Sequence, residues 1–162
     1  MHGAFISYGL LGLLAIALLV AAATDLRRRQ IDNWLNAAIA LAAPLFWWSC
    51  GFTLADIGGQ LATAAAIFVV LAVLFALRAM GGGDVKLLTA LALWIRPMAF
   101  VKLLMIMAIA GGVLTIACAC WHIARRQKDR IAVPYGVAIA LAGLWILAID
   151  YLPAAHAAVR IG

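Results

Sequence analysis

Long apolar runs separated by short polar breaks dominate this chain of 162 residues. A helix needs about 20 apolar residues to cross a bilayer, and most of the runs approach or exceed that length. Runs of this kind in lipid must be helical, because a helix satisfies its backbone hydrogen bonds within one segment. The pattern predicts six membrane-embedded helices, over residues 4–23, 34–50, 54–77, 85–95, 98–124 and 133–152.

The composition supports a membrane protein. Hydrophobic residues make up 69% of the chain and charged residues 11%, whereas soluble domains are about 45–50% apolar and about 25% charged. The mean hydropathy is +1.14. The loops between the runs are too short to hold a second domain. We therefore expect an all-α integral membrane protein, a compact bundle in which residues 1–162 form one transmembrane domain.

Two of the runs carry further signals. Residues 85–95 would cover only about half of a bilayer at about 1.5 Å per residue. Either the membrane is thin at this point, or Asp84 begins the run below the surface in a notch that water reaches. Trp47 and Trp48, near the end of the second run, are typical of an interfacial belt.

The net charge of +6 arises from basic residues at the ends of apolar runs. Such clusters mark cytoplasmic loops, so we expect both termini on the opposite side of the membrane. This distribution excludes nucleic acid as the expected partner and suggests a secondary attraction to anionic lipid. The basic clusters are Arg27–Arg29, Arg78 with Lys86, and Arg125, Arg126, Lys128 and Arg130.

Two aspartates, Asp25 and Asp84, stand at polar breaks on the same predicted side of the membrane. Two apolar runs separate them, and an even number of crossings returns the chain to the face it left. Two carboxylates at one depth can share a proton, so that one is ionised while the other is protonated. Such a pair can activate water and polarise a peptide carbonyl without a metal, a cofactor or a nucleophilic side chain.

Each aspartate also has a simpler interpretation. Asp84 follows the glycine run Gly81–Gly83, where each glycine costs a helix about 1 kcal/mol relative to alanine, and it could cap the next helix. Asp25 could be an interfacial charge paired with the arginines that follow it. The chain offers no Ser/His/Asp set, and its three cysteines form no C-x-x-C pair, so no metal site is indicated.

The motifs together make the chain resemble a type IV prepilin peptidase, and most closely the small peptidases of tight-adherence (Flp-type) pilus systems. The resemblance rests on Asp25, Ile31-Asp32-Asn33, Gly81-x-Gly83-Asp84-x-Lys86-Leu87 and Val133-Pro134-Tyr135-Gly136. It implies a six-helix, GxGD-type membrane aspartyl protease in which Asp25 and Asp84 are catalytic. It also implies supporting positions at Gly81, Gly83, Lys86 and Asn33, and site-lining positions at Pro134, Tyr135 and Gly136.

The same resemblance implies the substrates and the location. The substrates would be prepilin and pseudopilin precursors, cut at the cytoplasmic face of the bacterial inner membrane after a short basic leader. Other pilus-assembly components are possible partners. Larger relatives carry a domain with two C-x-x-C pairs that is associated with N-methylation; the loop between the first two runs has no room for it, so we expect cleavage without methylation.

The chain departs from the family pattern at Asp32, where relatives commonly have proline. Asp32 is a third nearby carboxylate, which could act as a local cap or substitute for Asp25. Two other functions remain open on sequence. Membrane acids and glycine-broken helices also occur in proton- or cation-coupled transporters. Small residues such as Gly111 and Gly112 would suit a non-catalytic assembly subunit that packs against a neighbour.

Overall fold

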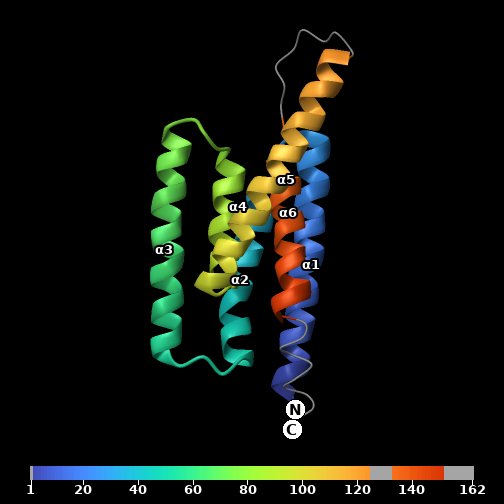
Figure 1. Cartoon of the computed structure of the whole chain (residues 1–162). Coiled ribbons are helices and arrows are strands. Elements are labelled where there is room, and N and C mark those ends of the chain that lie inside the picture. Colours follow the sequence, from blue (N-terminus) through green and yellow to red (C-terminus); the bar gives the residue numbers. More distant parts are fainter. Residues whose placement is uncertain (1, 125–132, 152–162) are drawn as a thin grey trace.

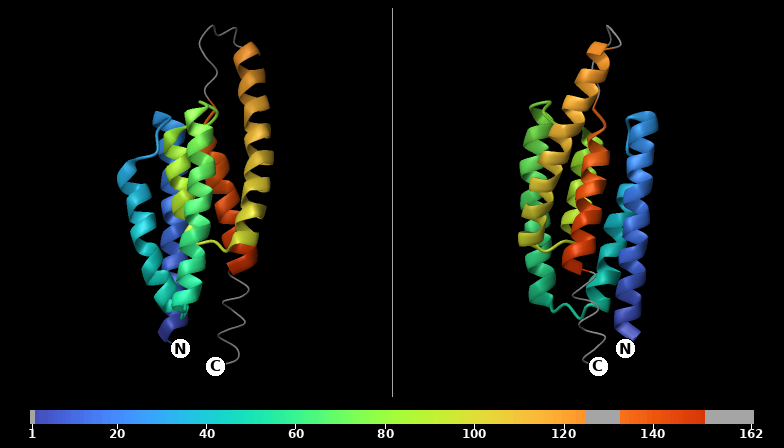
Figure 2. Two further views of the ribbon diagram at one scale, coloured as in Figure 1. Left: turned by 90° about the vertical axis from the view of Figure 1, so that its left-hand side faces the viewer. Right: turned by 45° about the vertical axis from the view of Figure 1, so that its right-hand side comes forward.

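The computed structural model describes residues 2–124 and 133–151, and every regular element within these ranges is a helix. The helices run roughly along one axis and form an elongated bundle (Figures 1 and 2). In chain order they are α1 (His2–Arg28), α2 (Asn33–Ser49), α3 (Leu54–Ala76), α4 (Gly82–Ala92), α5 (Pro97–Ala124), α6 (Tyr135–Ile146) and the π-helical turn η1 (Leu147–Tyr151).

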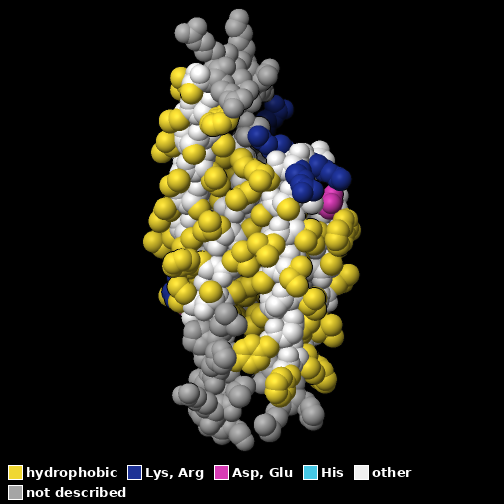
Figure 3. Space-filling view, turned by 90° about the vertical axis from the view of Figure 1, so that its right-hand side faces the viewer, with side chains coloured by type: hydrophobic (Ala, Val, Ile, Leu, Met, Phe, Trp, Pro, Cys, Tyr) yellow, Lys and Arg dark blue, Asp and Glu magenta, His cyan; other side chains and the backbone are white. Residues whose placement is uncertain are grey.

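The predicted all-helical class is confirmed. The structure is consistent with a membrane protein, but it supports fewer membrane spans than the six predicted. Within the part of the chain that the structure describes, three helices are long and apolar enough to cross a bilayer: α1 from Phe5, α3 and α5. Large side chains point outward along them, as expected where lipid is the solvent, and the face in Figure 3 is mostly hydrophobic along its length with lysine and arginine gathered near one end. The six-span topology stays a prediction.

Several predicted boundaries were wrong. α1 continues beyond Ala23 to Arg28, so Asp25 lies inside a helix rather than after one. α4 begins at Gly82, inside the glycine run and not after it. The last helix begins at Tyr135, and its predicted end at residue 152 lies outside the described residues.

α4 is short because neighbouring helices bind the backbone carbonyls around its end. The buried Gln60 of α3 donates its side-chain N–H groups to the carbonyls of Ala92 at 2.7 Å and Ile95 at 2.8 Å. Trp47 of α2 donates to the Leu93 carbonyl at 2.8 Å. These donors satisfy groups that would otherwise be unpaired in a dry environment. Trp47 is thus a core residue, which corrects its assignment to an interfacial belt, whereas Trp48 is exposed.

The turns show how the chain reverses direction. Thr53 and Asp56 form a capping box at the start of α3, and Gly51 precedes it with a φ of +70°. Two arginines take the left-handed conformation directly after helices: Arg29 after α1 (φ 56°) and Arg78 after α3 (φ 58°). Glycine usually occupies this position because a Cβ atom is strained there. The helices that precede these arginines, α1 and α3, end where α4 and α6 begin, at one end of the bundle (Figure 1).

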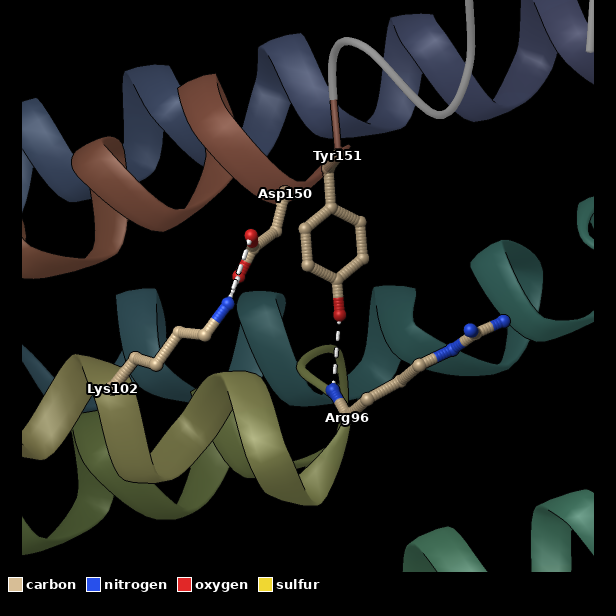
Figure 4. Close-up of polar contacts among 4 residues, drawn as sticks. All are labelled: Arg96, Lys102, Asp150 and Tyr151. Atoms are coloured by element: carbon tan, nitrogen blue, oxygen red, sulfur yellow. Dashed lines mark hydrogen bonds and ion pairs between the residues drawn. The ribbon is translucent and has the colours of Figure 1, made fainter. Parts of the chain in front are cut away.

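Polar contacts hold the opposite end of the bundle together (Figure 4). Lys102 of α5 pairs with Asp150 of η1 at 3.2 Å. The hydroxyl of Tyr151 accepts from the Arg96 backbone N–H at 2.9 Å and donates to the Trp94 carbonyl at 3.2 Å. These contacts tie the end of α6 to the link between α4 and α5.

The helices pack as two groups. α3 and α2 both pack on α4, while α1 and α5 both pack on α6. The two groups meet where α1 lies against α2 and where α4 lies against α6. The core spans both groups, and its fully buried members include Leu18, Leu88, Leu103 and Ile139.

Candidate active site

Asp25 is a buried carboxylate near the end of α1. Its side chain is only 6% exposed. Its Oδ2 atom accepts a hydrogen bond from the Gly136 backbone N–H at 2.8 Å, and the Val137 N–H also donates to it. Both donors belong to the first turn of α6, where the N–H groups have no partner within the helix. The start of α6 therefore orients the Asp25 carboxyl group.

Gly136 is required for this approach. A Cβ atom at this position would lie 2.8 Å from Oδ2 of Asp25 and 2.9 Å from its Cβ and Cγ atoms. The clash involves the Cβ atom of Asp25, so turning its carboxylate would not relieve it. Gly136 thus allows α6 to contact α1 at Asp25.

Asp84 is the third residue of α4 and lies in its first turn. Its carboxylate accepts a hydrogen bond from the Gly81 backbone N–H, which is the arrangement of a residue that reaches back to stabilise a helix start. The capping interpretation is therefore part of the structure, with Gly81 rather than Asp84 at the N-cap position. A Cβ atom on Gly81 would lie 2.9 Å from Oδ2 of Asp84.

The glycine run provides close packing rather than unusual backbone angles. Gly81 has a φ of −72° and a ψ of 144°, and none of the three glycines has a positive φ. A Cβ atom on Gly83 would lie 3.3 Å from the Cβ atom of Ile31, and one on Gly82 would lie 3.2 Å from the Phe75 ring. The start of α4 can thus approach both the link between α1 and α2 and the end of α3.

Asp25 and Asp84 line one pocket of about 390 Å³, as expected from their positions on the same side of two crossings. We call it the polar pocket. Burial, and then the neighbouring Asp25 charge, raises the pKa of Asp84 to about 6, against a smaller opposing effect of the Gly81 hydrogen bond. Asp84 therefore keeps its proton up to about pH 6, where an ordinary aspartate is already ionised. The lining residues are Asp25, Arg29, Gln30, Ile31, Asp32, Asn33, Gly81, Gly82, Gly83 and Asp84.

A second, larger pocket of about 660 Å³ shares Gly81 and Asp84 with the polar pocket. We call it the apolar pocket, because apolar side chains from three regions of the bundle line most of it. Tyr135 contributes from the start of α6 and Met107 from α5. The lining residues are Phe75, Ala76, Arg78, Ala79, Met80, Gly81, Asp84, Met107 and Tyr135.

The expected supporting residues lie around these pockets. Lys86 donates to the Asn33 side-chain carbonyl at 2.7 Å, which links α4 to the start of α2. Pro134 is buried at the N-cap position of α6, and the exposed Tyr135 reaches the apolar pocket. The structure thus places Asn33 and Tyr135 in the pockets and Lys86 beside Asn33, while their catalytic roles stay predictions.

Asp32 lies in the polar pocket but does not cap a helix through its side chain. It occupies the N-cap position of α2 without a side-chain capping bond. The carboxylate therefore faces a site that contains both candidate catalytic acids. Among residues 2–124 and 133–151, no group of three or more His, Cys, Asp or Glu side chains is arranged to hold a metal ion.

Sequence reasoning missed part of the site. Gln30 had no signal beyond its place in a polar break. Met107 lies within an apolar helix whose positions look alike in sequence, so nothing marked it as a pocket residue. Arg29 and Arg78 were recognised only as topology signals, yet they line the polar and the apolar pocket, respectively. Their positive φ angles depend on how the helices end, which charge pattern alone does not reveal.

Comparison with known sequences gives one match. The sequence model of the type IV leader peptidase family matches residues 12–120, which is more than half of the chain and includes both Asp25 and Asp84. The matched segment ends before Gly136. A search of curated proteins and a search of solved structures each found no match.

Proposed function

Because the chain belongs to the type IV leader peptidase family, we propose that it is a membrane-embedded aspartyl endopeptidase that removes leader peptides from prepilin and pseudopilin precursors. The observation that carries the proposal is the placement of Asp25 and Asp84 in one pocket. Aspartyl chemistry needs two nearby carboxyl groups in different protonation states. Two carboxyl groups that helices place at one pocket support this assignment.

The environments of the two carboxyl groups suggest how they divide the work. Asp25 is held in place by backbone N–H groups at the start of α6, and we assign it the removal of a proton from water. Asp84, whose pKa is raised to about 6, supplies the proton that polarises the scissile carbonyl. Water adds to the carbonyl carbon to give a tetrahedral intermediate. The C–N bond then breaks as the leaving amine takes the proton that Asp25 received, and the former carbonyl oxygen returns its proton to Asp84.

We further propose that the precursors are of the Flp type and that cleavage occurs without N-methylation. The link between α1 and α2 comprises residues 29–32 alone, which is too short for the cysteine-bearing domain expected of methylating relatives. The basic residues at the end of α1 and near the start of α4 lie at the same end as the site, which supports a cytoplasmic orientation under the positive-inside rule.

The test is cleavage of a cognate pilin precursor by purified protein in liposomes. We expect the Asp25→Asn and Asp84→Asn variants to lose cleavage by at least about 10³-fold, because asparagine cannot shuttle the proton. Asp150→Asn is the matched control, since this carboxylate lies at the opposite end of the bundle. Full activity in either site variant would contradict the proposal, and wild-type protein without cleavage activity would redirect the search to transport.

A further inference from the structure

Asn36 is a buried polar residue of α2 that the mechanism above does not use. Its side chain is 5% exposed, and among the described residues neither its amide nitrogen nor its amide oxygen has a hydrogen-bond partner. Buried polar groups in proteins nearly always have a partner, which is either a protein group or a bound water. An unpaired amide is especially costly in apolar surroundings. The Asn36 amide is therefore a candidate binding site for a small polar ligand.

A second buried amide shows the contrast. Gln60 is buried to the same degree, at 6% exposed, but its side chain donates to two backbone carbonyls near the end of α4. A leucine in place of Asn36 would fill a similar volume and leave no polar atom unpaired, so stability alone would favour leucine at this position. A role in the site explains the Asn36 amide better than stability does.

Asn36 lies one helical turn beneath the polar pocket, at the depth of Asp25. Its backbone N–H donates to the carbonyl of Asp32 at 3.3 Å. In the same way, the Arg29 N–H donates to the carbonyl of Asp25 at 2.8 Å, one turn inside α1. Asp32 and Arg29 both line the polar pocket. Residues three or four positions apart share one face of a helix, so Asn36 lies on the same side of α2 as Asp32 and Asn33.

The packing of α2 brings this buried amide to the helices that carry the two aspartates. α2 packs on α1, which contains Asp25, and on α4, which contains Asp84. Asp25 lies on the inward stripe of α1, four residues after the fully buried Ala21 and seven after the fully buried Leu18. Asn36 and Asp25 thus face the interior of the bundle at one level, on neighbouring antiparallel helices.

A water molecule is the ligand that fits this position. An asparagine amide supplies both donors and an acceptor, and a buried water makes about three hydrogen bonds to such groups. The Asp25 carboxyl group accepts from the start of α6, but a carboxylate has about four acceptor positions, so others remain for water. The polar pocket, one turn away, gives water a route to both groups. Among the described residues, no cluster of acidic, histidine or cysteine side chains favours a metal ion instead.

We propose that Asn36 binds a buried water beneath the polar pocket, and that this water holds the Asp25 carboxyl group in the orientation that hydrolysis requires. The positioning role rests on the proposed peptidase function, whereas the water site does not. Asn36 is a positioning residue in this scheme, because it acts through the water and Asp25 and does not touch the substrate. The bound water is distinct from the one that hydrolysis consumes.

The water site is tested directly, without an activity measurement. A crystal structure of the wild-type protein from a lipidic phase, at a resolution that shows ordered waters, should contain a water roughly 2.7–3.2 Å from both the Asn36 amide and the Asp25 carboxyl group. The Asn36→Leu variant should lack this water. A wild-type Asn36 amide that binds a protein group, or that binds no water, would overturn the inference.

The positioning role is tested by precursor cleavage with the Asn36→Leu variant. We expect kcat to fall at least about tenfold while KM stays within about twofold of wild type, because the precursor does not contact Asn36. The midpoint of thermal unfolding should not fall, and should rise by up to about 4 °C, since leucine leaves no buried polar group to satisfy. Asn36→Ser, whose hydroxyl group also binds water, should keep more of the wild-type kcat than Asn36→Leu does.

Two matched variants separate positioning from a structural role. Gln60→Leu makes a similar change at an amide that has protein partners, so its unfolding midpoint should fall. Ala37→Leu adds an apolar side chain at the neighbouring exposed position of α2 and should change neither kcat nor the midpoint.

Three outcomes would contradict one part of the scheme each. A lower midpoint in Asn36→Leu, like that of Gln60→Leu, would make Asn36 a structural residue. An unchanged kcat in Asn36→Leu would overturn the positioning role while leaving the peptidase function intact. Wild-type protein that binds the water but cleaves no precursor would overturn the proposed function and the positioning role with it, and would support the water site alone.

Discussion

Gly136 offers the sharpest test of how the site is built, through the substitution Gly136→Ala. The added Cβ atom would approach three atoms of Asp25 to within 2.8–2.9 Å, whereas ordinary contacts begin at 3.4 Å. α6 must then move away from α1 by about 0.5 Å or more. Overpacking of this kind costs about 1–3 kcal/mol, and a weakened hydrogen bond to a charged group costs about 1.5–3 kcal/mol. Because one displacement causes both effects, we expect a total loss of about 2–4 kcal/mol in unfolding free energy.

The effect on cleavage should be larger than the effect on folding. A displacement approaching 1 Å at a reacting group can cost about 10²-fold in rate, so we expect kcat to fall by about 30- to 100-fold. The assay is precursor cleavage in liposomes at a temperature well below the unfolding midpoint of the variant, which is measured in parallel. This temperature keeps a loss of folded protein from being counted as a loss of catalysis.

Gly112→Ala is the matched control for this experiment. Gly112 lies in α5, and a Cβ atom there would meet nothing within 4 Å. The same substitution should therefore leave cleavage unchanged and raise stability by about 0.5–1 kcal/mol, because alanine favours a helix interior over glycine. Wild-type cleavage and an unchanged unfolding midpoint in Gly136→Ala would refute the reasoning that α6 must contact Asp25 through a glycine.

Three further predictions concern other parts of the bundle. The pKa of Asp84 is raised to about 6 in the folded protein, so the contribution of this group to stability is fully present below pH 4 and is lost as the pH rises through 6. The value of kcat should likewise fall above pH 6 as the shared proton leaves. A flat pH–rate profile from pH 5 to 8 would contradict this prediction. The Gln60→Leu variant should have an unfolding free energy about 1–3 kcal/mol below that of the wild type, because the carbonyls of Ala92 and Ile95 lose their donor. An unchanged midpoint of thermal unfolding would show that other groups satisfy these carbonyls. The Lys102→Met variant should lower the unfolding free energy by less than about 1 kcal/mol and leave cleavage intact, since Lys102 is 60% exposed in its pair with Asp150. A large drop in the unfolding midpoint in the same thermal assay would show that the ion pair is needed to hold the fold.

The sequence predicted the pairing of Asp25 and Asp84 because that pairing follows from topology alone. An even number of crossings places both carboxyl groups at one end whatever the details of packing. The role of Gly136 could not be worked out in the same way. It contacts Asp25 across 111 positions of sequence, and only the relative placement of α1 and α6 brings the two together.

Other errors have local physical causes. Helix propensity placed the start of α4 after the glycine run, but tertiary packing against Ile31 and Phe75 includes two of these glycines in the helix. Trp47 looked like an interfacial residue because tryptophan is common there. In the structure its indole N–H finds a carbonyl on α4, an interaction that composition does not encode. Single-sequence patterns describe elements better than the contacts between them.

The division of the bundle into two helix groups has a consequence for how the site responds to its surroundings. Asp84 belongs to the group of α2, α3 and α4, whereas Asp25 and the α6 turn that orients it belong to the group of α1, α5 and α6. The separation of the two carboxyl groups therefore depends on how the two helix groups pack against each other, and not on the packing within either helix group. Because bilayer thickness and lateral pressure act on helix packing, we expect the lipid composition to alter this separation, and with it the rate of cleavage.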